Sequence, residues 1–179
     1  MSCVLANIIL GPDGATVVDG SSRALSFPED RKRFLQIRTL ADVIIVGGNT
    51  ARCEPYGITP IPLIVLSKTS DMGTAASNPM ATSWNLNLEV ALERINDQYE
   101  HILLETGLSL LLPALEAGLV DVLYVTVADS LIRHPSERSI SSPQAAVSLQ
   151  SLTHGYTEYE CHHVPGGSFI TYHIAPSHD

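Results

Sequence analysis

Short apolar runs recur along the first 128 residues of the chain, and segments of helical spacing separate them. The runs span four to seven residues and lie at residues 4–10, 42–46, 63–66, 101–104 and 122–127. Runs of this length are typical of strands that are buried on both faces of a parallel sheet. We therefore predict a sheet with these strands at its centre.

Helical patterns fill several of the gaps between the runs. Ser-Phe-Pro-Glu at 26–29 combines a capping box with a proline in the first turn, which predicts a helix to about Leu40. Its buried face is expected to carry Phe34, Ile37 and Leu40. Further helices are expected over residues 88–95, with Asn87 as the N-cap, and over 109–117, closed by Gly118 at the C′ position.

The end of the chain has a different pattern. Residues 156–164 and 168–175 flank Pro165-Gly-Gly167, which predicts an antiparallel hairpin. Strands that alternate with helices imply an α/β fold with a mostly parallel sheet, which this hairpin makes mixed. Residues 69–87 are expected to be mostly loop with one weak strand. Residues 129–155 show no clear periodicity of hydrophobic positions.

Composition indicates one folded domain over residues 1–179. The chain is 45% hydrophobic and 16% charged, and its net charge is −9. Such an acidic balance argues against a general nucleic-acid binder. Residues 1–70 nevertheless carry a net charge of +1 against −10 for residues 71–179, so an anionic ligand in the first part of the chain remains open beside ordinary solvated helix charges.

The sequence shows little evidence of a targeting segment, a membrane span or a metal site. No apolar stretch approaches the roughly 20 residues that span a bilayer, and the first apolar run lacks the basic segment of a signal peptide. Cys3, Cys53 and Cys161 are odd in number and lack a CxxC spacing, so neither a disulfide framework nor a zinc site is expected. We expect a cytoplasmic protein without membrane contact and without a bound metal.

Two strand ends carry small residues directly before a helical segment. These are Gly47-Gly-Asn-Thr50 and Glu105-Thr-Gly-Leu-Ser109. In open α/β sheets ligands bind beyond the carboxyl ends of the strands, and free N–H groups at a helix start favour phosphate. Two such turns together suggest a cradle for a pyrophosphate, although each one alone is better explained as an ordinary strand-to-helix turn.

The sequence contains no recognisable nucleophile–base motif. His162 and His163 are neighbours in a predicted strand, so they point to opposite faces and do not easily share a metal. One of them is expected to be exposed and the other packed. Chemistry carried by a bound cofactor would account for the missing acid–base residues.

Two separated motifs resemble the reductase domain of the bifunctional riboflavin-biosynthesis deaminase/reductase. The first comprises residues 19–31 (DGSSRALSFPEDR) and 38–52 (RTLADVIIVGGNTAR). The second comprises residues 102–110 (ILLETGLSL) and 117–128 (AGLVDVLYVTVA). Residues 51–57 (ARCEPYG) are similar to stand-alone pyrimidine reductase-like members. The order and spacing of the two motifs agree with the family, and the resemblance covers residues 3–128.

This resemblance implies a three-layer, dihydrofolate-reductase-like fold with helices on both faces of the sheet, and a homodimer that uses NADPH. The family reduces the ribosylamino group of 5-amino-6-(5-phosphoribosylamino)uracil to a ribitylamino group by hydride transfer. A small phosphorylated pyrimidine would therefore be the substrate.

The resemblance also implies roles for particular residues. The cofactor would contact Gly47, Gly48, Asn49, Thr50, Arg52, Ser67, Gly107, Leu108, Ser109 and Leu110, with Lys68 near the 2′-phosphate beside Ser67. The substrate would face Ser22, Arg38, Glu54 and Glu105. Asp13 and Glu105 would be the catalytic residues.

Three departures from the family pattern keep other functions open. Thr106 stands where the family has glycine, and a β-branched residue does not readily adopt a positive φ. Residues 55–66 contain no Arg or Lys to hold a substrate phosphate, and Asp129-Ser-Leu-Ile-Arg-His134 replaces a Pro and Gly-Gly element. A reductase for another heterocyclic or carbonyl substrate, or an inactive dimeric paralogue, therefore stays as an alternative.

Overall fold

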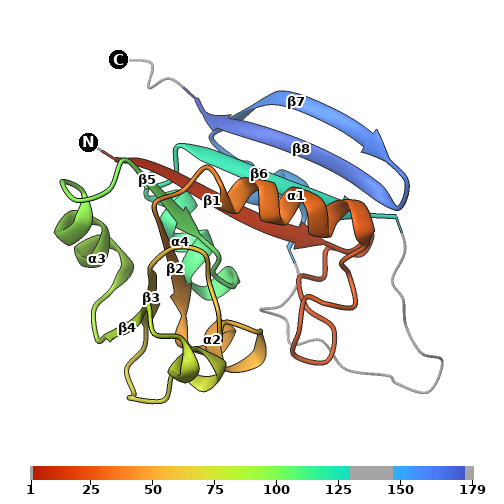
Figure 1. Cartoon of the computed structure of the whole chain (residues 1–179). Coiled ribbons are helices and arrows are strands. Elements are labelled where there is room, and N and C mark those ends of the chain that lie inside the picture. The colour runs from red at the N-terminus through yellow and green to blue at the C-terminus, as the bar shows by residue number, and fades with distance from the viewer. Residues whose placement is uncertain (1, 130–146, 176–179) are drawn as a thin grey trace.

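A mixed sheet forms the centre of the computed structural model, which describes residues 2–129 and 147–175. Its eight strands are ordered β4-β3-β2-β5-β1-β6-β8-β7 (Figure 1). The strands are β1 (Cys3–Leu10), β2 (Val43–Gly47), β3 (Leu63–Leu66), β4 (Ala81–Trp84), β5 (His101–Leu104), β6 (Val122–Ala128), β7 (Tyr156–Val164) and β8 (Gly167–Ile174). The pairs among β1 to β6 are parallel, and β8 pairs antiparallel with β6 and β7. The predicted mostly parallel sheet with a terminal hairpin is confirmed.

Helices cover both faces of the sheet, which gives the predicted three layers. The helices are α1 (Pro28–Arg38), α2 (Gly48–Cys53), α3 (Leu88–Ile95), α4 (Leu108–Glu116), α5 (Leu149–Leu152) and the 3₁₀ helix η1 (Gly73–Ser77). Apolar residues of α3, α4 and α5 pack on one face, and those of α1, α2 and η1 pack on the other. Because β2 and β3 contact both layers, every residue in them is buried.

The two helix caps that the sequence placed at the ends of α3 and α4 are confirmed. Asn87 Oδ1 accepts a hydrogen bond from the N–H of Val90 at 2.9 Å, and Gly118 adopts a φ of +65° just beyond α4. Both are local signals, because the cap residue contacts the backbone only a few positions away.

The start and the end of α1 differ from the prediction. Phe27 rather than Ser26 is the N-cap, and no side chain accepts a hydrogen bond from the first N–H groups of the helix. The Ser26 hydroxyl instead donates to Asp30 Oδ2 at 2.6 Å. The helix ends at Arg38, so Leu40 lies beyond it and is 50% exposed instead of facing the core. Ile37 is buried as expected.

The terminal hairpin also holds a correction. Every residue of β7 between its two ends is exposed, and this includes both His162 and His163, so neither histidine is packed. Beyond β6, residues 130–134 of the Asp129–His134 element lie outside the described residues. No helix in the described part of the chain is both long and apolar enough to cross a membrane.

The parallel arrangement has one consequence for function. The carboxyl ends of β1, β2, β3, β5 and β6 open on a common edge of the sheet, and both candidate turns follow strands that end there.

Candidate functional site

The two glycine-containing turns lie against each other. A side chain at Gly47, the last residue of β2, would place its Cβ 3.0 Å from Leu110 Cδ1 on α4. A Cβ at Gly107 would lie 3.8 Å from Thr50 Oγ1 on α2. The structure thus brings together the two segments that the sequence assigned to one ligand.

The start of α4 is open for an anion. Gly107 is the N-cap in an extended conformation, and no side chain caps the helix. The first N–H groups of a helix lack partners within it, so a phosphate is a suitable acceptor there. Leu108 is buried in the core, so its side chain is not available to a ligand.

Thr106 does not distort this turn. Among the described non-glycine residues, only Asp19 has a positive φ, so the backbone here does not need the family's glycine. The Thr106 side chain is buried, and its Oγ1 has no hydrogen-bond partner among the described residues.

A polar cluster lies beside the first turn of α2. A Cβ at Gly48 would lie 2.8 Å from Ser67 Oγ and 3.2 Å from an Arg52 guanidinium nitrogen. Arg52 donates to the side-chain oxygen of Asn49 and, at 3.5 Å, to the carbonyl of Asp71. Arg52 and Asn49 are exposed, so this group of polar side chains remains accessible beside the two turns.

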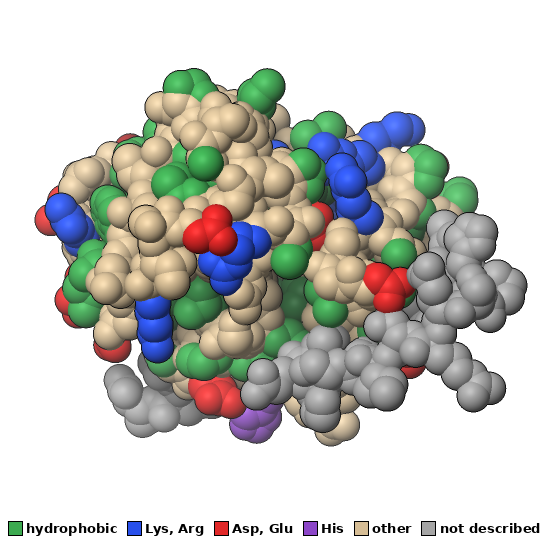
Figure 2. Space-filling model, turned by 90° about the horizontal axis from the view of Figure 1, so that it is seen from below, with side chains coloured by type: hydrophobic (Ala, Val, Ile, Leu, Met, Phe, Trp, Pro, Cys, Tyr) green, Lys and Arg blue, Asp and Glu red, His purple; other side chains and the backbone are tan. Residues whose placement is uncertain are grey.

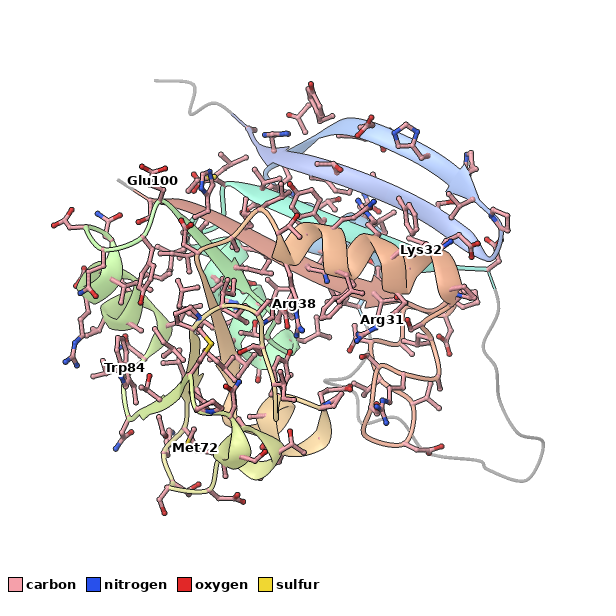
Figure 3. All side chains as sticks on the ribbon, viewed as in Figure 1. Arg31, Lys32, Arg38, Met72, Trp84 and Glu100 are labelled. Atoms are coloured by element: carbon pink, nitrogen blue, oxygen red, sulfur yellow. The ribbon has the colours of Figure 1, made fainter. Side chains whose placement is uncertain are left out.

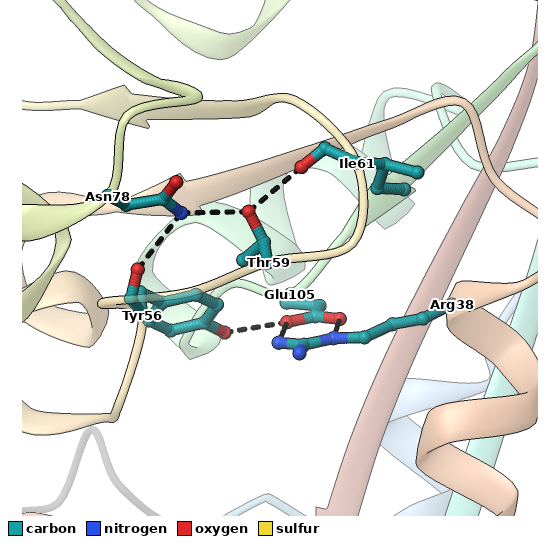
Figure 4. Close-up of polar contacts among 6 residues, drawn as sticks. All are labelled: Arg38, Tyr56, Thr59, Ile61, Asn78 and Glu105. Atoms are coloured by element: carbon teal, nitrogen blue, oxygen red, sulfur yellow. Dashed lines mark hydrogen bonds and ion pairs between the residues drawn. The ribbon is translucent and has the colours of Figure 1, made fainter.

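Arg38, labelled in Figure 3, forms a buried ion pair with Glu105 at the end of β5 (Figure 4). Arg38 Nε and a terminal guanidinium nitrogen each donate to a different Glu105 oxygen at 2.7 Å. The guanidinium also stacks over Phe34, 4.4 Å from the ring centroid. Burial alone would lower the pKa of Arg38, but its hydrogen bonds with Glu105 and the charge of that carboxylate raise the pKa overall.

Tyr56 completes this network, and the sequence interpretation did not single it out. Its hydroxyl donates to Glu105 Oε2 at 2.7 Å (Figure 4). Burial raises the pKa of Tyr56 well above the ordinary value, and the adjacent Glu105 charge adds to this effect. Its backbone carbonyl accepts a hydrogen bond from Asn78 Nδ2 at 3.1 Å. The ARCEPYG motif contained the only sequence signal for this residue.

Glu54 and Ser22, both expected at the substrate, bind each other. Glu54 Oε1 accepts from the Ser22 N–H at 2.7 Å and from the Ser21 and Ser22 hydroxyls at 3.0 Å each. The loop that carries these serines turns through Asp19 and Gly20, both with positive φ. We call residues 18–25 the strap, because Glu54 ties them to the end of α2.

Asp13 lies in a hollow at the carboxyl ends of β1 and β6. This cavity has a volume of about 510 Å³ and is lined by Leu10, Gly11, Pro12, Asp13, Gly14, Val127, Val147, Ser148 and Leu149. Asp13 Oδ1 accepts the N–H of Ala15 at 3.1 Å. Figure 2 shows a face on which acidic and basic side chains lie among apolar ones around hollowed regions. Within the described ranges, no three potential ligands gather to hold a metal.

Comparisons with known proteins agree with this architecture. The family model described as the RibD C-terminal domain matches residues 3–154. A pyrimidine reductase-like protein from Corynebacterium diphtheriae superposes with a TM-score of 0.73 at 20% identity, over 98% of this chain and 93% of that one. No curated protein sequence matches the chain.

Two further proteins with the same fold are longer than this chain. RibD from Acinetobacter baumannii has a TM-score of 0.71 at 14% identity, over 98% of this chain and 58% of that one. A Thermotoga maritima deaminase/5-amino-6-(5-phosphoribosylamino)uracil reductase has a TM-score of 0.63 at 10% identity, over 97% and 57% of the two chains. The fold is therefore the dihydrofolate-reductase-like fold of these reductases, and the chain belongs to the RibD C-terminal domain family.

Proposed function

We propose that this chain is an NADPH-dependent reductase of riboflavin biosynthesis that acts in the cytoplasm. Its substrate would be 5-amino-6-(5-phosphoribosylamino)uracil, whose ribosylamino group becomes a ribitylamino group. Membership of the RibD C-terminal domain family supports the reaction class. The observation that carries the proposal is the contact between the β2–α2 and β5–α4 turns, beside an α4 start that no side chain caps.

The cofactor fits this edge of the sheet. The open start of α4 would hold the pyrophosphate on backbone N–H groups, and Gly107 leaves the space that a side chain would fill. Arg52, Ser67 and Lys68 would face the 2′-phosphate of the adenosine ribose. The cofactor-binding residues in this proposal are Gly47, Gly48, Asn49, Thr50, Arg52, Ser67, Gly107, Leu108, Ser109 and Leu110.

The substrate would lie between the strap and the carboxyl ends of β1 and β5. When bound, NADPH supplies a hydride to C1 of the ring-opened sugar imine. Ser22, Arg38 and Glu105 would form the wall around the pyrimidine, with Glu54 holding Ser22 in that wall, and Asp13 would lie near the reacting carbon. The Arg38 charge compensates that of Glu105, which allows the carboxylate to stay buried as a hydrogen-bond acceptor.

Turnover tests this proposal directly. Oxidation of NADPH, followed by its absorbance, should depend on both the enzyme and the phosphoribosylaminopyrimidine. If energy transfer from the protein shows that NADPH binds while this substrate gives only the enzyme-free rate, the substrate assignment is wrong. Another small heterocyclic or carbonyl substrate then becomes the better candidate, which the lack of Arg and Lys in residues 55–66 favours. If NADPH does not bind, the inactive paralogue is the better description.

Arg52 provides a test of cofactor choice. Replacing Arg52 with Ala should weaken NADPH binding about tenfold, because a charge-assisted contact with the 2′-phosphate is lost from an exposed position. NADH lacks that phosphate, so its affinity should not change. Calorimetric titration of both nucleotides measures the difference. An unchanged NADPH affinity would assign Arg52 to its contacts with Asn49 and Asp71 alone.

We also propose that two copies of the chain associate through the terminal hairpin. A groove of about 530 Å³ lies between α1 and the hairpin, and Leu40, Tyr124, Val164 and Phe169 provide apolar lining. Exposed β7 carries acids in its first half and histidines in its second, at Glu158, Glu160, His162 and His163. A two-fold axis would therefore place the acidic half of one strand opposite the imidazoles of the other.

Sedimentation equilibrium tests this association. Leu40 is half-exposed, so Leu40→Glu should leave the fold intact but weaken the dimer at least about tenfold by placing a carboxylate in an apolar contact. Val90→Glu is the matched control, because Val90 is similarly exposed on α3, outside the groove. A wild-type monomer, or equal effects of the two variants, would rule out this interface.

A further inference from the structure

Two side chains of one short segment contact different walls of the proposed substrate site. Glu54 holds the strap through three hydrogen bonds to a single carboxylate oxygen. Two residues later, Tyr56 donates to the Glu105 carboxylate at the end of β5. The segment 54–56 therefore connects a loop near the start of the chain with a strand end in its middle.

The segment itself is firmly held. Thr74 Oγ1 donates to the carbonyl of Glu54 at 2.5 Å and accepts the N–H of Tyr56 at 2.8 Å. Asn78 Nδ2 donates to the carbonyl of Tyr56. Because η1 and the residue after it hold the backbone on both sides of Pro55, they fix the positions of Glu54 and Tyr56 relative to each other.

The hydrogen bonds also limit what Glu105 can do. A carboxylate offers about four acceptor positions. Arg38 takes one on each oxygen, and Tyr56 takes a second on Oε2. One position, on Oε1, is left for a donor from outside this network.

We propose that Glu54 and Tyr56 are positioning residues and that the segment 54–56 is a brace between the strap and Glu105. The brace sets the separation of these two walls and leaves one acceptor position on Glu105 for an N–H or O–H group of the substrate. Glu54 thus acts through Ser21 and Ser22 instead of binding the substrate itself. The consequence for turnover rests on the proposed reductase function, whereas the hydrogen-bonded connection between the strap and Glu105 does not.

Amide-resolved hydrogen exchange by NMR tests the strap end of the brace without any substrate. Glu54→Ala should raise the exchange rate of the Ser22 N–H about tenfold or more, since a charge-assisted hydrogen bond is lost. Glu54→Gln should restore part of the protection, because its amide oxygen still accepts. Glu93→Ala, an exposed change on α3, is the control and should leave Ser22 unchanged. Wild-type exchange at Ser22 in Glu54→Ala would overturn the brace.

Steady-state kinetics separate positioning from direct contact. Ser21 is not among the proposed substrate residues, but its hydroxyl binds Glu54. If Glu54 acts through the strap, Ser21→Ala and Tyr56→Phe should both raise KM for the pyrimidine, by about threefold to tenfold. The Kd for NADPH should stay at the wild-type value.

A wild-type KM in both variants, combined with a raised KM in Glu54→Ala, would show that Glu54 contacts the substrate and would overturn the positioning role. If the wild-type enzyme does not turn over the pyrimidine, the proposed function fails. The exchange experiment then still decides whether Glu54 holds the strap.

Discussion

Replacing Arg38 with Met is expected to lower the free energy of unfolding by about 3–5 kcal/mol. The variant leaves the Glu105 carboxylate buried without its cation, and only 3% of that side chain is exposed. Removing one partner of a buried pair costs more than the pair contributes, because the remaining charge is not solvated. Urea denaturation measures the loss, and for a chain of this size the midpoint of thermal unfolding should fall by roughly 6–20 °C.

The double variant Arg38→Met/Glu105→Gln is the control for this prediction. Without the carboxylate no charge is left buried, so most of the lost stability should return, while the amide oxygen can still accept from Tyr56. A single variant within about 1 kcal/mol of the wild type would contradict the buried pair. Equal losses in the single and double variants would instead assign the effect to the packing of Arg38 on Phe34.

Replacing Gly107 with Asp should abolish most nucleotide binding while leaving the fold at least as stable. Gly107 is the N-cap of α4 in an extended conformation, and a Cβ there meets nothing closer than 3.8 Å. An aspartate in this position caps the helix and favours it. Its charge would lie beside the proposed pyrophosphate, and like charges a few ångströms apart should raise the Kd at least about 100-fold.

Gly107→Asn is the matched control. It has nearly the same shape and also caps the helix, but it carries no charge, so its Kd for NADPH should rise far less than that of the Asp variant. Calorimetric titration gives both constants, and thermal unfolding confirms that the variants are folded. Equal affinities for the Asp and Asn variants would exclude a phosphate group at the start of α4.

Local signals explain why the sequence predicted most of the fold. The apolar runs became β1, β2, β3, β5 and β6, and every residue of β2 and β3 is buried, as an uninterrupted apolar pattern predicts. Asn87 and Gly118 act on backbone groups within the same turn. The predicted cap of α1 is not formed, and the Ser26 hydroxyl instead donates to Asp30, a partner that the capping-box pattern does not consider.

The geometry of the site depended on contacts between distant residues. The sequence assigned Arg38 and Glu105 to the substrate, but it could not show that they bind each other across 67 positions. Tyr56 joins them because η1 holds the segment 54–56, which no periodicity indicates. Thr106 stood out as a departure because the family's glycine suggested a positive φ at this position. The backbone of Thr106 does not have a positive φ.

The central claim is that the β2–α2 and β5–α4 turns together hold NADPH. A crystal structure of the protein soaked with NADPH tests it most directly. The account predicts density for the pyrophosphate at Gly107–Ser109, with the adenosine 2′-phosphate near Ser67 and Arg52. Nucleotide density elsewhere, or none at a concentration that saturates binding in solution, would contradict it.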